Sequence, residues 1–172
     1  MRTTYYVAAS LDRFIAGSKG ELDWLPMDVD YGFHEFLASV DGVVMGARTY
    51  EMIRTFGKWP YGELPGWVFS TDPEGPALPQ VQFVSGRVRP VLEQIRGSGI
   101  DHLWLVGGGT LARSFVDEGA VDEWRLFVIP ILLGGGIPLL AGESRGSRTD
   151  LELAGERSFE NGVVELRYRR SE

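Results

Sequence analysis

The sequence of 172 residues predicts an α/β fold of three layers, with helices on both faces of a mainly parallel mixed sheet. Short apolar runs alternate along the chain with segments of helical apolar spacing, a pattern typical of parallel sheets covered on both sides. Residues 151–170 differ, because two alternating runs flank Asn161-Gly162, the strongest short signal for a hairpin. We therefore expect a C-terminal antiparallel hairpin, and we expect residues 1–172 to form one domain, since no linker or repeat interrupts them.

The individual elements follow from the same patterns. Runs rich in β-formers predict strands at 4–10, 42–45, 67–70, 81–84, 103–106, 124–129, 151–159 and 163–170. Apolar residues at helical spacing predict helices at 30–39, 48–56, 91–95 and 110–118. The remaining stretches are expected to be loops, and those at 11–26, 72–80 and 130–147 are rich in turn-forming residues.

The segment from Leu103 to Phe115 says most about function. An apolar run ends in the three glycines Gly107–Gly109, and a helical pattern follows. Glycine lets the backbone approach a ligand closely, and a helix N-terminus offers unpaired N–H groups at a positive dipole end. The segment therefore predicts a phosphate cradle, with a tight turn that binds no ligand as the alternative. The third glycine of the Rossmann dinucleotide fingerprint is missing.

A second short strand breaks at a glycine in the same way. The run Val43–Met45 ends at Gly46, and a helical pattern begins directly after it. Arg48 and Thr49 stand in the first turn of that helix, where they could meet phosphate oxygens. Two such turns in one chain favour a nucleotide-binding protein over a plain α/β scaffold.

Composition excludes several classes of protein. A net charge of −7 argues against a nucleic-acid surface, and the absence of cysteine excludes disulfides and thiolate chemistry. His34 and His102 have no ligand spacing between them, so we expect no metal site. We expect no membrane span and no signal peptide, because no apolar stretch is long enough and only Arg2 precedes the first strand. These features together favour a cytoplasmic protein.

Four motifs resemble the dihydrofolate reductase superfamily, most closely the branch that contains the reductase domain of riboflavin biosynthesis. They are AASLDRFIA at 8–16, MGARTYE at 45–51, VGGG at 106–109 and PILLGGGIPL at 130–139. The last motif is similar to the riboflavin branch and unlike the folate reductases. The resemblance covers essentially the whole chain. It implies a cis peptide between Gly107 and Gly108.

The resemblance also implies an NADPH-dependent reductase. By position, it assigns cofactor contacts to Ala8, Ile15, Ala16, Gly46, Ala47, Arg48, Thr49, Ser70, Thr71, Gly107, Gly108, Gly109, Thr110 and Leu111. The first three of these would line the nicotinamide, Ser70 and Thr71 would face the adenosine ribose with its 2′-phosphate, and the others would face phosphates. The family usually has arginine directly after Met-Gly. Here Ala47 stands there and Arg48 follows, which would shift the 2′-phosphate contact.

Candidate catalytic and substrate residues are less sharply defined. Folate reductases place a carboxylate early in the first helix, and Asp30 is the best candidate here, in competition with Asp28 and Glu35. Helix capping is the alternative role of Asp30, and Asp12 is expected to form a turn. Trp24 and Phe33 could stack on a flat heterocycle or belong to the core. The N–H groups of Gly134, Gly135 and Gly136 could bind a substrate phosphate, with a flexible turn as the alternative.

The leading functional hypothesis is hydride transfer from NADPH to a small heterocyclic or ribosyl substrate. A narrower form of it is 5-amino-6-(5-phosphoribosylamino)uracil reductase in riboflavin biosynthesis. The alternatives are a dihydrofolate reductase and a nucleotide-binding module without turnover. The resemblance further implies a homodimer.

Overall fold

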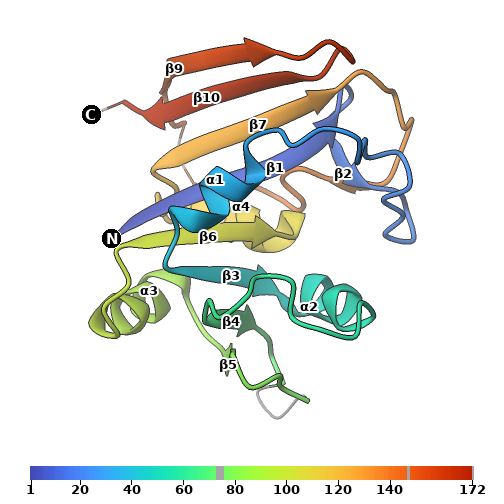
Figure 1. The fold of residues 1–172 in the computed structure, drawn as a ribbon. Helices are drawn as coiled ribbons and strands as arrows, with labels where there is room; N and C mark the ends of the chain where they lie inside the picture. The colour runs from blue at the N-terminus through green and yellow to red at the C-terminus, as the bar shows by residue number, and fades with distance from the viewer. Residues whose placement is uncertain (73–75, 147, 172) are drawn as a thin grey trace.

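An eight-stranded sheet runs through the centre of the molecule (Figure 1). The computed structural model describes residues 1–72, 76–146 and 148–171. In spatial order the strands of the sheet are β5 (Val81–Val84), β4 (Gly66–Phe69), β3 (Gly42–Gly46), β6 (His102–Gly107), β1 (Arg2–Ser10), β7 (Glu123–Ile129), β10 (Val164–Arg170) and β9 (Leu151–Ser158). All pairs from β5 to β7 are parallel, and β10 pairs antiparallel with both β7 and β9. The mainly parallel mixed sheet with a C-terminal hairpin is therefore confirmed.

Helices cover both faces of the parallel part of the sheet. The helices are α1 (Phe33–Ala38), α2 (Ala47–Arg54), α3 (Val88–Gly97) and α4 (Gly109–Asp117). Strand residues alternate between the two cores, since Val43 and Met45 pack with α1 and α2 whereas Val44 packs with α3 and α4. This alternation confirms the predicted three layers. None of the described helices is long and apolar enough to cross a membrane.

Two short strands lie in segments that the sequence predicted to be loops. The strands β2 (Phe14–Ala16) and β8 (Ile137–Pro138) pair antiparallel and form a small separate sheet. Strands of three and two residues are too short to show a period of two, so the sequence pattern could not reveal them. They bring the loop after β1 against the glycine-rich loop after β7.

Three other boundaries differ from the prediction for identifiable reasons. α1 begins only at Phe33, because Gly32 has a φ of 82° and lies outside the helical region. α3 begins at Val88, before the predicted start, since Pro90 is tolerated in a first turn where its missing N–H has no helical partner. The hairpin turn spans Phe159 to Gly162 rather than the two residues Asn161-Gly162, and the N–H of Gly162 donates to the Phe159 carbonyl at 2.9 Å.

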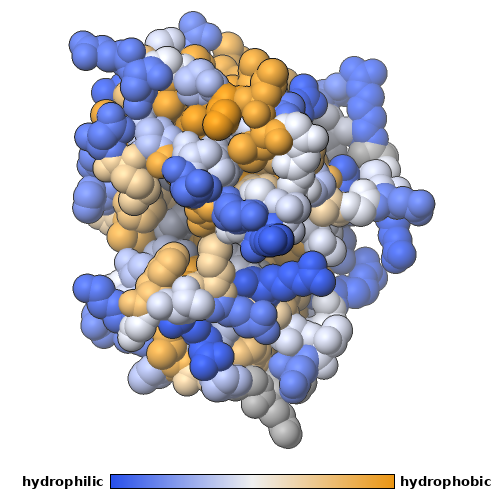
Figure 2. All heavy atoms as spheres, turned by 90° about the vertical axis from the view of Figure 1, so that its right-hand side faces the viewer, coloured by the Kyte–Doolittle hydropathy of each residue, from blue (hydrophilic) through white to orange (hydrophobic). Residues whose placement is uncertain are grey.

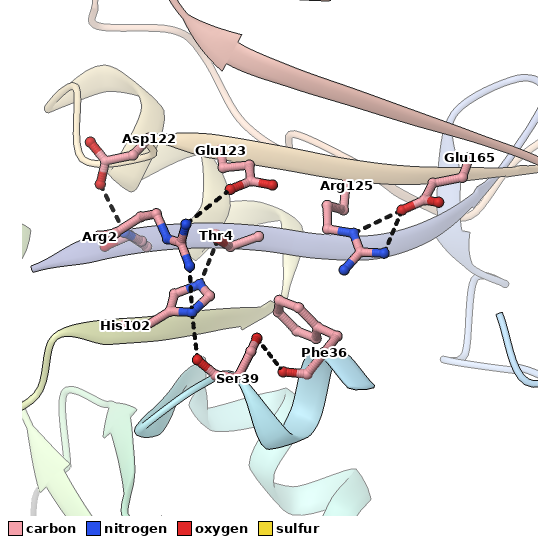
Figure 3. Close-up of polar contacts among 10 residues, drawn as sticks. Arg2, Thr4, Phe36, Ser39, His102, Asp122, Glu123, Arg125 and Glu165 are labelled. Atoms are coloured by element: carbon pink, nitrogen blue, oxygen red, sulfur yellow. Dashed lines mark hydrogen bonds and ion pairs between the residues drawn. The ribbon is translucent and has the colours of Figure 1, made fainter. Parts of the chain in front are cut away.

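A polar network joins the amino-terminal ends of β1 and β6 (Figure 3). The His102 Nδ1–H donates to the Ser39 carbonyl at 2.8 Å, and its Nε2 accepts from the Thr4 hydroxyl at 2.8 Å. The Arg2 guanidinium lies 2.9 Å from the same Nδ1. The backbone N–H of His102 donates to Asp41 at 2.8 Å. The network therefore joins β1, β6 and the segment that follows α1.

Candidate active site

The two glycine turns meet at the carboxyl ends of neighbouring strands. Met45 at the end of β3 is in register with Gly107 at the end of β6. A Cβ placed on Gly108 would lie 3.4 Å from the Thr49 hydroxyl, and one on Gly46 would lie 3.9 Å from the Leu111 Cβ. The turns that were inferred separately from the sequence thus form one surface.

Their position in the sheet is the one where open α/β folds bind ligands. From β3 the chain continues through α2 to β4 on one side, and from β6 it continues through α4 across β1 to β7 on the other side. This divergence is a topological switch point, and ligands bind outside the carboxyl ends of the strands at such points. Seen end-on in Figure 2, this side of the molecule mixes hydrophilic and hydrophobic side chains, and the hydrophobic ones gather in its upper part.

The starts of α2 and α4 leave their first N–H groups available. Both N-cap residues, Gly46 and Gly108, lack a side chain that could cap the helix, and neither helix has an acidic residue in its first turn. Arg48 nevertheless stands in the first turn of α2, where a cation is disfavoured by the helix dipole. An anion bound at this place would satisfy the N–H groups and the guanidinium together.

The three glycines of the β6 turn differ in what they do. Gly107 has a φ of 139°, a backbone conformation that side chains rarely adopt, and the peptide between Gly107 and Gly108 is cis, which confirms the expectation. Gly109 is packed against the chain, because a Cβ there would lie 2.2 Å from the Pro138 carbonyl oxygen. Gly109 therefore begins α4 and also allows β8 and the residues after it to pack closely against the start of that helix.

The residues predicted to hold the adenosine end lie beside α2. Ser70 and Thr71 directly follow β4, the strand next to β3. The Ser70 hydroxyl accepts the N–H of Asp72 at 3.0 Å, which turns the chain away from the sheet. Part of the predicted surface loop 72–80, residues 73–75, lies outside the described residues.

The Asp12 carboxylate joins the loop that follows β1 to the glycine-rich loop that follows β7. Asp12 accepts the Ser10 hydroxyl at 2.6 Å, the Leu133 N–H at 3.1 Å and the Gly134 N–H at 2.8 Å. The bond from Ser10, followed by those from the two backbone N–H groups, lowers the pKa of Asp12, so the carboxylate stays ionised. Asp12 thus does more than form a turn, because it fastens one loop to the other.

This lock changes the role of the glycine loop. The N–H of Gly134, one of the groups predicted to hold a substrate phosphate, is already bound to Asp12. Gly136 lies against Ala16, since a Cβ on Gly136 would be 2.2 Å from the Ala16 carbonyl oxygen. Gly134 and Gly136 therefore help to hold the loops together, and a phosphate contact through the N–H groups of Gly135 and Gly136 stays a prediction. Ala16, predicted to line the nicotinamide, is buried in this junction, and Ile15 packs towards the α3–α4 core.

An aromatic cluster lies on the α1 side of the sheet next to Ala8. Tyr6 stacks on Phe36 with ring centroids 4.3 Å apart and lies 4.8 Å from Phe127. Phe33 contacts Tyr6 at 6.1 Å, while Trp24 packs with Ala8 and Phe127. The two aromatic residues proposed as substrate contacts are thus brought to the same face. Tyr6 and Phe127 were missed, although the period of two in β1 places Tyr6 on the face of Ala8.

A buried ion pair lies under this cluster (Figure 3). Glu165 accepts from Arg125 through Nε at 2.8 Å and Nη2 at 2.6 Å, and the guanidinium lies 5.1 Å from the Tyr6 ring centre. Sequence reasoning missed both residues, because their meeting depends on the register between β7 and β10. No group of three or more acidic residues or histidines among the described residues is arranged to hold a metal ion.

Asp30 binds the first N–H of α1, although Gly32 and not Asp30 occupies the N-cap position. One of its carboxylate oxygens accepts the Phe33 N–H at 2.7 Å at the start of α1, and the other accepts from His34 Nδ1 at 3.0 Å. The bonds from His34 and Phe33 lower the pKa of Asp30, whose side chain is 49% exposed. An exposed carboxylate that remains ionised is poorly suited to deliver a proton.

The fold and the paired glycine turns define the class, an α/β protein of the dihydrofolate reductase type. Within that class the chain belongs to the RibD C-terminal domain family, whose pattern matches residues 3–165. The chain is 33% identical over 174 residues to the uncharacterized protein YwjB of Bacillus subtilis, covering 99% of this chain and 98% of that protein. It is 30% identical to the uncharacterized protein YyaP of the same organism, covering 94% and 91%.

Solved structures and one short match extend the comparison. A protein assigned to riboflavin biosynthesis from Shewanella sp. PV-4 superposes with a TM-score of 0.87 at 32% identity, covering all of both chains. The deaminase/5-amino-6-(5-phosphoribosylamino)uracil reductase of Thermotoga maritima has the same fold, with a TM-score of 0.75 at 17% identity over 99% of this chain and 56% of that one. A stretch of 45 residues is 44% identical to the 2,5-diamino-6-ribosylamino-4(3H)-pyrimidinone 5′-phosphate reductase of Methanothermobacter thermautotrophicus, and it covers 26% of this chain and 21% of that protein.

Proposed function

We propose that this protein is an NADPH-dependent reductase that transfers hydride to a small heterocyclic or ribosyl substrate. The observation that carries the proposal is the pair of uncapped helix starts at the switch point, with Arg48 in a position that favours an anion. Membership of the RibD C-terminal domain family supports the reductase class.

The residues present fit a dinucleotide phosphate. The N–H groups at the starts of α2 and α4 would bind the pyrophosphate, and Arg48 with Ser70 and Thr71 would bind the 2′-phosphate. The nicotinamide supplies the hydride when the cofactor is bound. The chain orients the reactants, and the loops locked by Asp12 would exclude water above Ala8.

For the substrate we propose a phosphorylated ribosylaminopyrimidine, of the kind named in the archaeal and Thermotoga relatives. The aromatic cluster around Tyr6 and Phe33 offers flat faces on which such a ring could stack. Dihydrofolate is the weaker candidate, because Asp30 is exposed and bound to α1 rather than directed at a buried ring.

Cofactor binding is tested by calorimetry with NADPH and NADH on the wild type and Arg48→Gln. A charge-assisted bond contributes about 1.5–3 kcal/mol, so we expect NADPH to bind roughly tenfold or more tightly than NADH. Arg48→Gln should remove that difference. The control is Arg54→Gln, an exposed arginine in the last turn of the same helix. Equal affinities for both cofactors in the wild type would exclude the assigned 2′-phosphate contact.

Turnover is tested by following NADPH oxidation with a phosphorylated ribosylaminopyrimidine and with dihydrofolate. We expect the first to react, and dihydrofolate to stay well below the ordinary enzyme range of kcat/KM, about 10⁴ M⁻¹s⁻¹. Fast reduction of dihydrofolate that collapses in Asp30→Asn would instead support the folate reductase. Tight NADPH binding without turnover of either compound would support a nucleotide-binding module.

A further inference from the structure

The two sides of the central strand β1 are not equally buried. Tyr5 and Val7, on the side of α3 and α4, are buried, whereas Tyr6 and Ala8, on the side of α1, are half-buried. On the neighbouring strand β6, Val106 is half-buried on the same side as Tyr6. A strand in the middle of a parallel sheet is normally covered on both sides. The α1 side of the sheet is therefore partly open around Tyr6, Ala8 and Val106, and we call these three residues the open positions.

The open positions lie where a substrate of the proposed reductase would have to bind. Ala8 is the residue assigned to the nicotinamide, and Val106 directly precedes the glycine turn at the end of β6. Tyr6 lies two residues before Ala8 on the same side of β1, a distance of about 7 Å along a strand. That distance is close to the width of a single heterocyclic ring with its substituents. A ring placed over Ala8 to accept hydride would therefore have one edge beside Tyr6.

The ring of Tyr6 is held on several sides by its neighbours. It stacks on Phe36 with the ring planes 15° apart, and it contacts Phe127 at 4.8 Å and the edge of Trp104 at 5.9 Å. The Arg125 guanidinium lies 5.1 Å from the centre of the same ring. Because this packing leaves the side chain few rotamers, the position of the Tyr6 hydroxyl is set before any ligand binds.

The Tyr6 hydroxyl has no hydrogen-bond partner within the part of the chain that the structure describes. Two other tyrosines differ from it, since the Tyr5 hydroxyl donates to the Leu139 carbonyl at 3.2 Å and the Tyr50 hydroxyl donates to the Pro76 carbonyl at 3.1 Å. A phenol in largely apolar surroundings usually finds such a partner. The Tyr6 hydroxyl is therefore available to bind a ligand at the open positions.

The surroundings of this hydroxyl keep it protonated. Burial, which has the largest effect, raises the pKa of Tyr6 far above its ordinary value of 10.0. Arg125 acts against burial, whereas the carboxylates of Glu165 and Asp30 raise the pKa of Tyr6 further. A phenol that stays neutral donates a hydrogen bond to a carbonyl oxygen, and it is a poor source of a proton for transfer. Its chemistry at this site is therefore that of a hydrogen-bond donor.

We propose that the Tyr6 hydroxyl recognises the substrate by donating a hydrogen bond to a carbonyl oxygen of its ring, which holds the ring beside Ala8. This inference rests on the proposed function for the place of the ring, and it adds a group that selects pyrimidinones over rings without a carbonyl. The aromatic residues already proposed as substrate contacts do not supply this bond. Phe33 has no polar side-chain atom, and the Trp24 Nε1–H donates to the Glu21 carbonyl at 3.1 Å. The Tyr6 hydroxyl keeps its proton, so it takes no part in the transfer of hydride.

Calorimetry on the wild type, Tyr6→Phe and the control Tyr168→Phe tests this inference with two probes, with and without NADPH. The probes are 2,5,6-triamino-4-pyrimidinone and 2,4,5-triaminopyrimidine, which is the same ring without the carbonyl oxygen. We expect Tyr6→Phe to bind the pyrimidinone roughly fivefold more weakly and the second probe as the wild type does, because one net hydrogen bond is lost. Tyr168→Phe removes a hydroxyl from the opposite side of the sheet and should bind both probes like the wild type.

Further results separate this inference from the proposed function. Tyr6→Phe should unfold at the wild-type temperature and bind NADPH with wild-type affinity, because no hydrogen bond within the protein is lost. A lower Tm would show that the hydroxyl serves the fold and would overturn the inference. A pyrimidinone that binds Tyr6→Phe and the wild type equally, or that fails to bind the wild type, also overturns it, even if NADPH is oxidised. Weaker binding that depends on the carbonyl, without any oxidation of NADPH, would support recognition by Tyr6 and reject the reductase.

Discussion

Among single residues, the Arg125–Glu165 pair is the contact whose loss we expect to destabilise the fold most. Glu165 is 4% exposed and Arg125 is 19% exposed, and the guanidinium also lies over the rings of Tyr6 and Phe36. Removing one partner of a buried pair leaves an uncompensated charge, which costs about 3–5 kcal/mol. We therefore expect Glu165→Leu to lower the free energy of unfolding by that amount in urea denaturation.

The double variant Arg125→Leu/Glu165→Leu is the control for this prediction. Replacing both charges with apolar side chains leaves no buried charge, so the double variant should be more stable than Glu165→Leu alone. If the two variants unfold at the same urea concentration, the charges do not act as a pair.

A second prediction about a single residue concerns Asp12. Asp12→Asn keeps one carbonyl oxygen and so can accept fewer of the three bonds that Asp12 accepts. We expect the amides of Leu133 and Gly134 to exchange with solvent faster, which hydrogen exchange followed by NMR measures. Asp28→Asn, an exposed carboxylate elsewhere in the loop region, should leave both rates unchanged. Unchanged rates in Asp12→Asn would show that the lock does not hold the loops.

At the scale of elements, the β2–β8 unit depends on a glycine that no other residue can replace. Gly136 has a φ of 139°, and a Cβ there would lie 2.2 Å from the Ala16 carbonyl oxygen. Gly136→Ala should therefore cost about 1–3 kcal/mol or displace β8 from β2. Gly135→Ala is the matched control, because nothing lies within 4 Å of its Cβ position. Differential scanning calorimetry should show a lower Tm for the first variant only.

The sequence predicted those strands and helices whose pattern of apolar residues reflects their burial. β3 and β6 are short apolar runs between the two helix layers, and their ends at Gly46 and Gly107 could be found from glycine alone. β2 and β8 could not, since their pairing follows from loop contacts such as Asp12 with Gly134. These contacts join residues about 120 positions apart, and no local pattern specifies them.

The candidate site divides in the same way. The glycine turns and helix starts of the proposed phosphate site were predictable, because they are local features of the chain. The aromatic and carboxylate side of the candidate site was only partly predictable. Asp30 and Glu165 are both carboxylates in the sequence, and only the register of β10 on β7 shows that Glu165 is the buried one.

At the scale of the whole molecule, the His102 network makes stability depend on pH. Burial, together with the Arg2 charge, lowers the pKa of His102 below its ordinary value of 6.5, although the Ser39 carbonyl acts the other way. The unfolded chain therefore binds a proton at a higher pH than the folded one, and the free energy of unfolding falls as the pH drops below about 6.5. Urea denaturation at a series of pH values measures this slope.

Two variants test the source of that slope. His102→Gln should flatten the pH dependence between the folded and unfolded pKa values of the histidine. His34→Gln should keep it, because His34 is on the surface with 83% of its side chain exposed. If the pH dependence disappears in His34→Gln and persists in His102→Gln, it does not come from the titration of His102.

The order of strands in the sheet has a consequence for biosynthesis. β1 lies between β6 and β7, and its first residue, Arg2, is in register with His102. While the ribosome is still making residues before His102, β1 has no neighbour with which to pair, and its hydrogen-bonding edges stay open. Contacts between distant parts of a chain form slowly, and unpaired strand edges aggregate. In the nascent chain β1 therefore cannot pair until β6 has been synthesised. We expect chaperones to bind mainly to β1 during that interval.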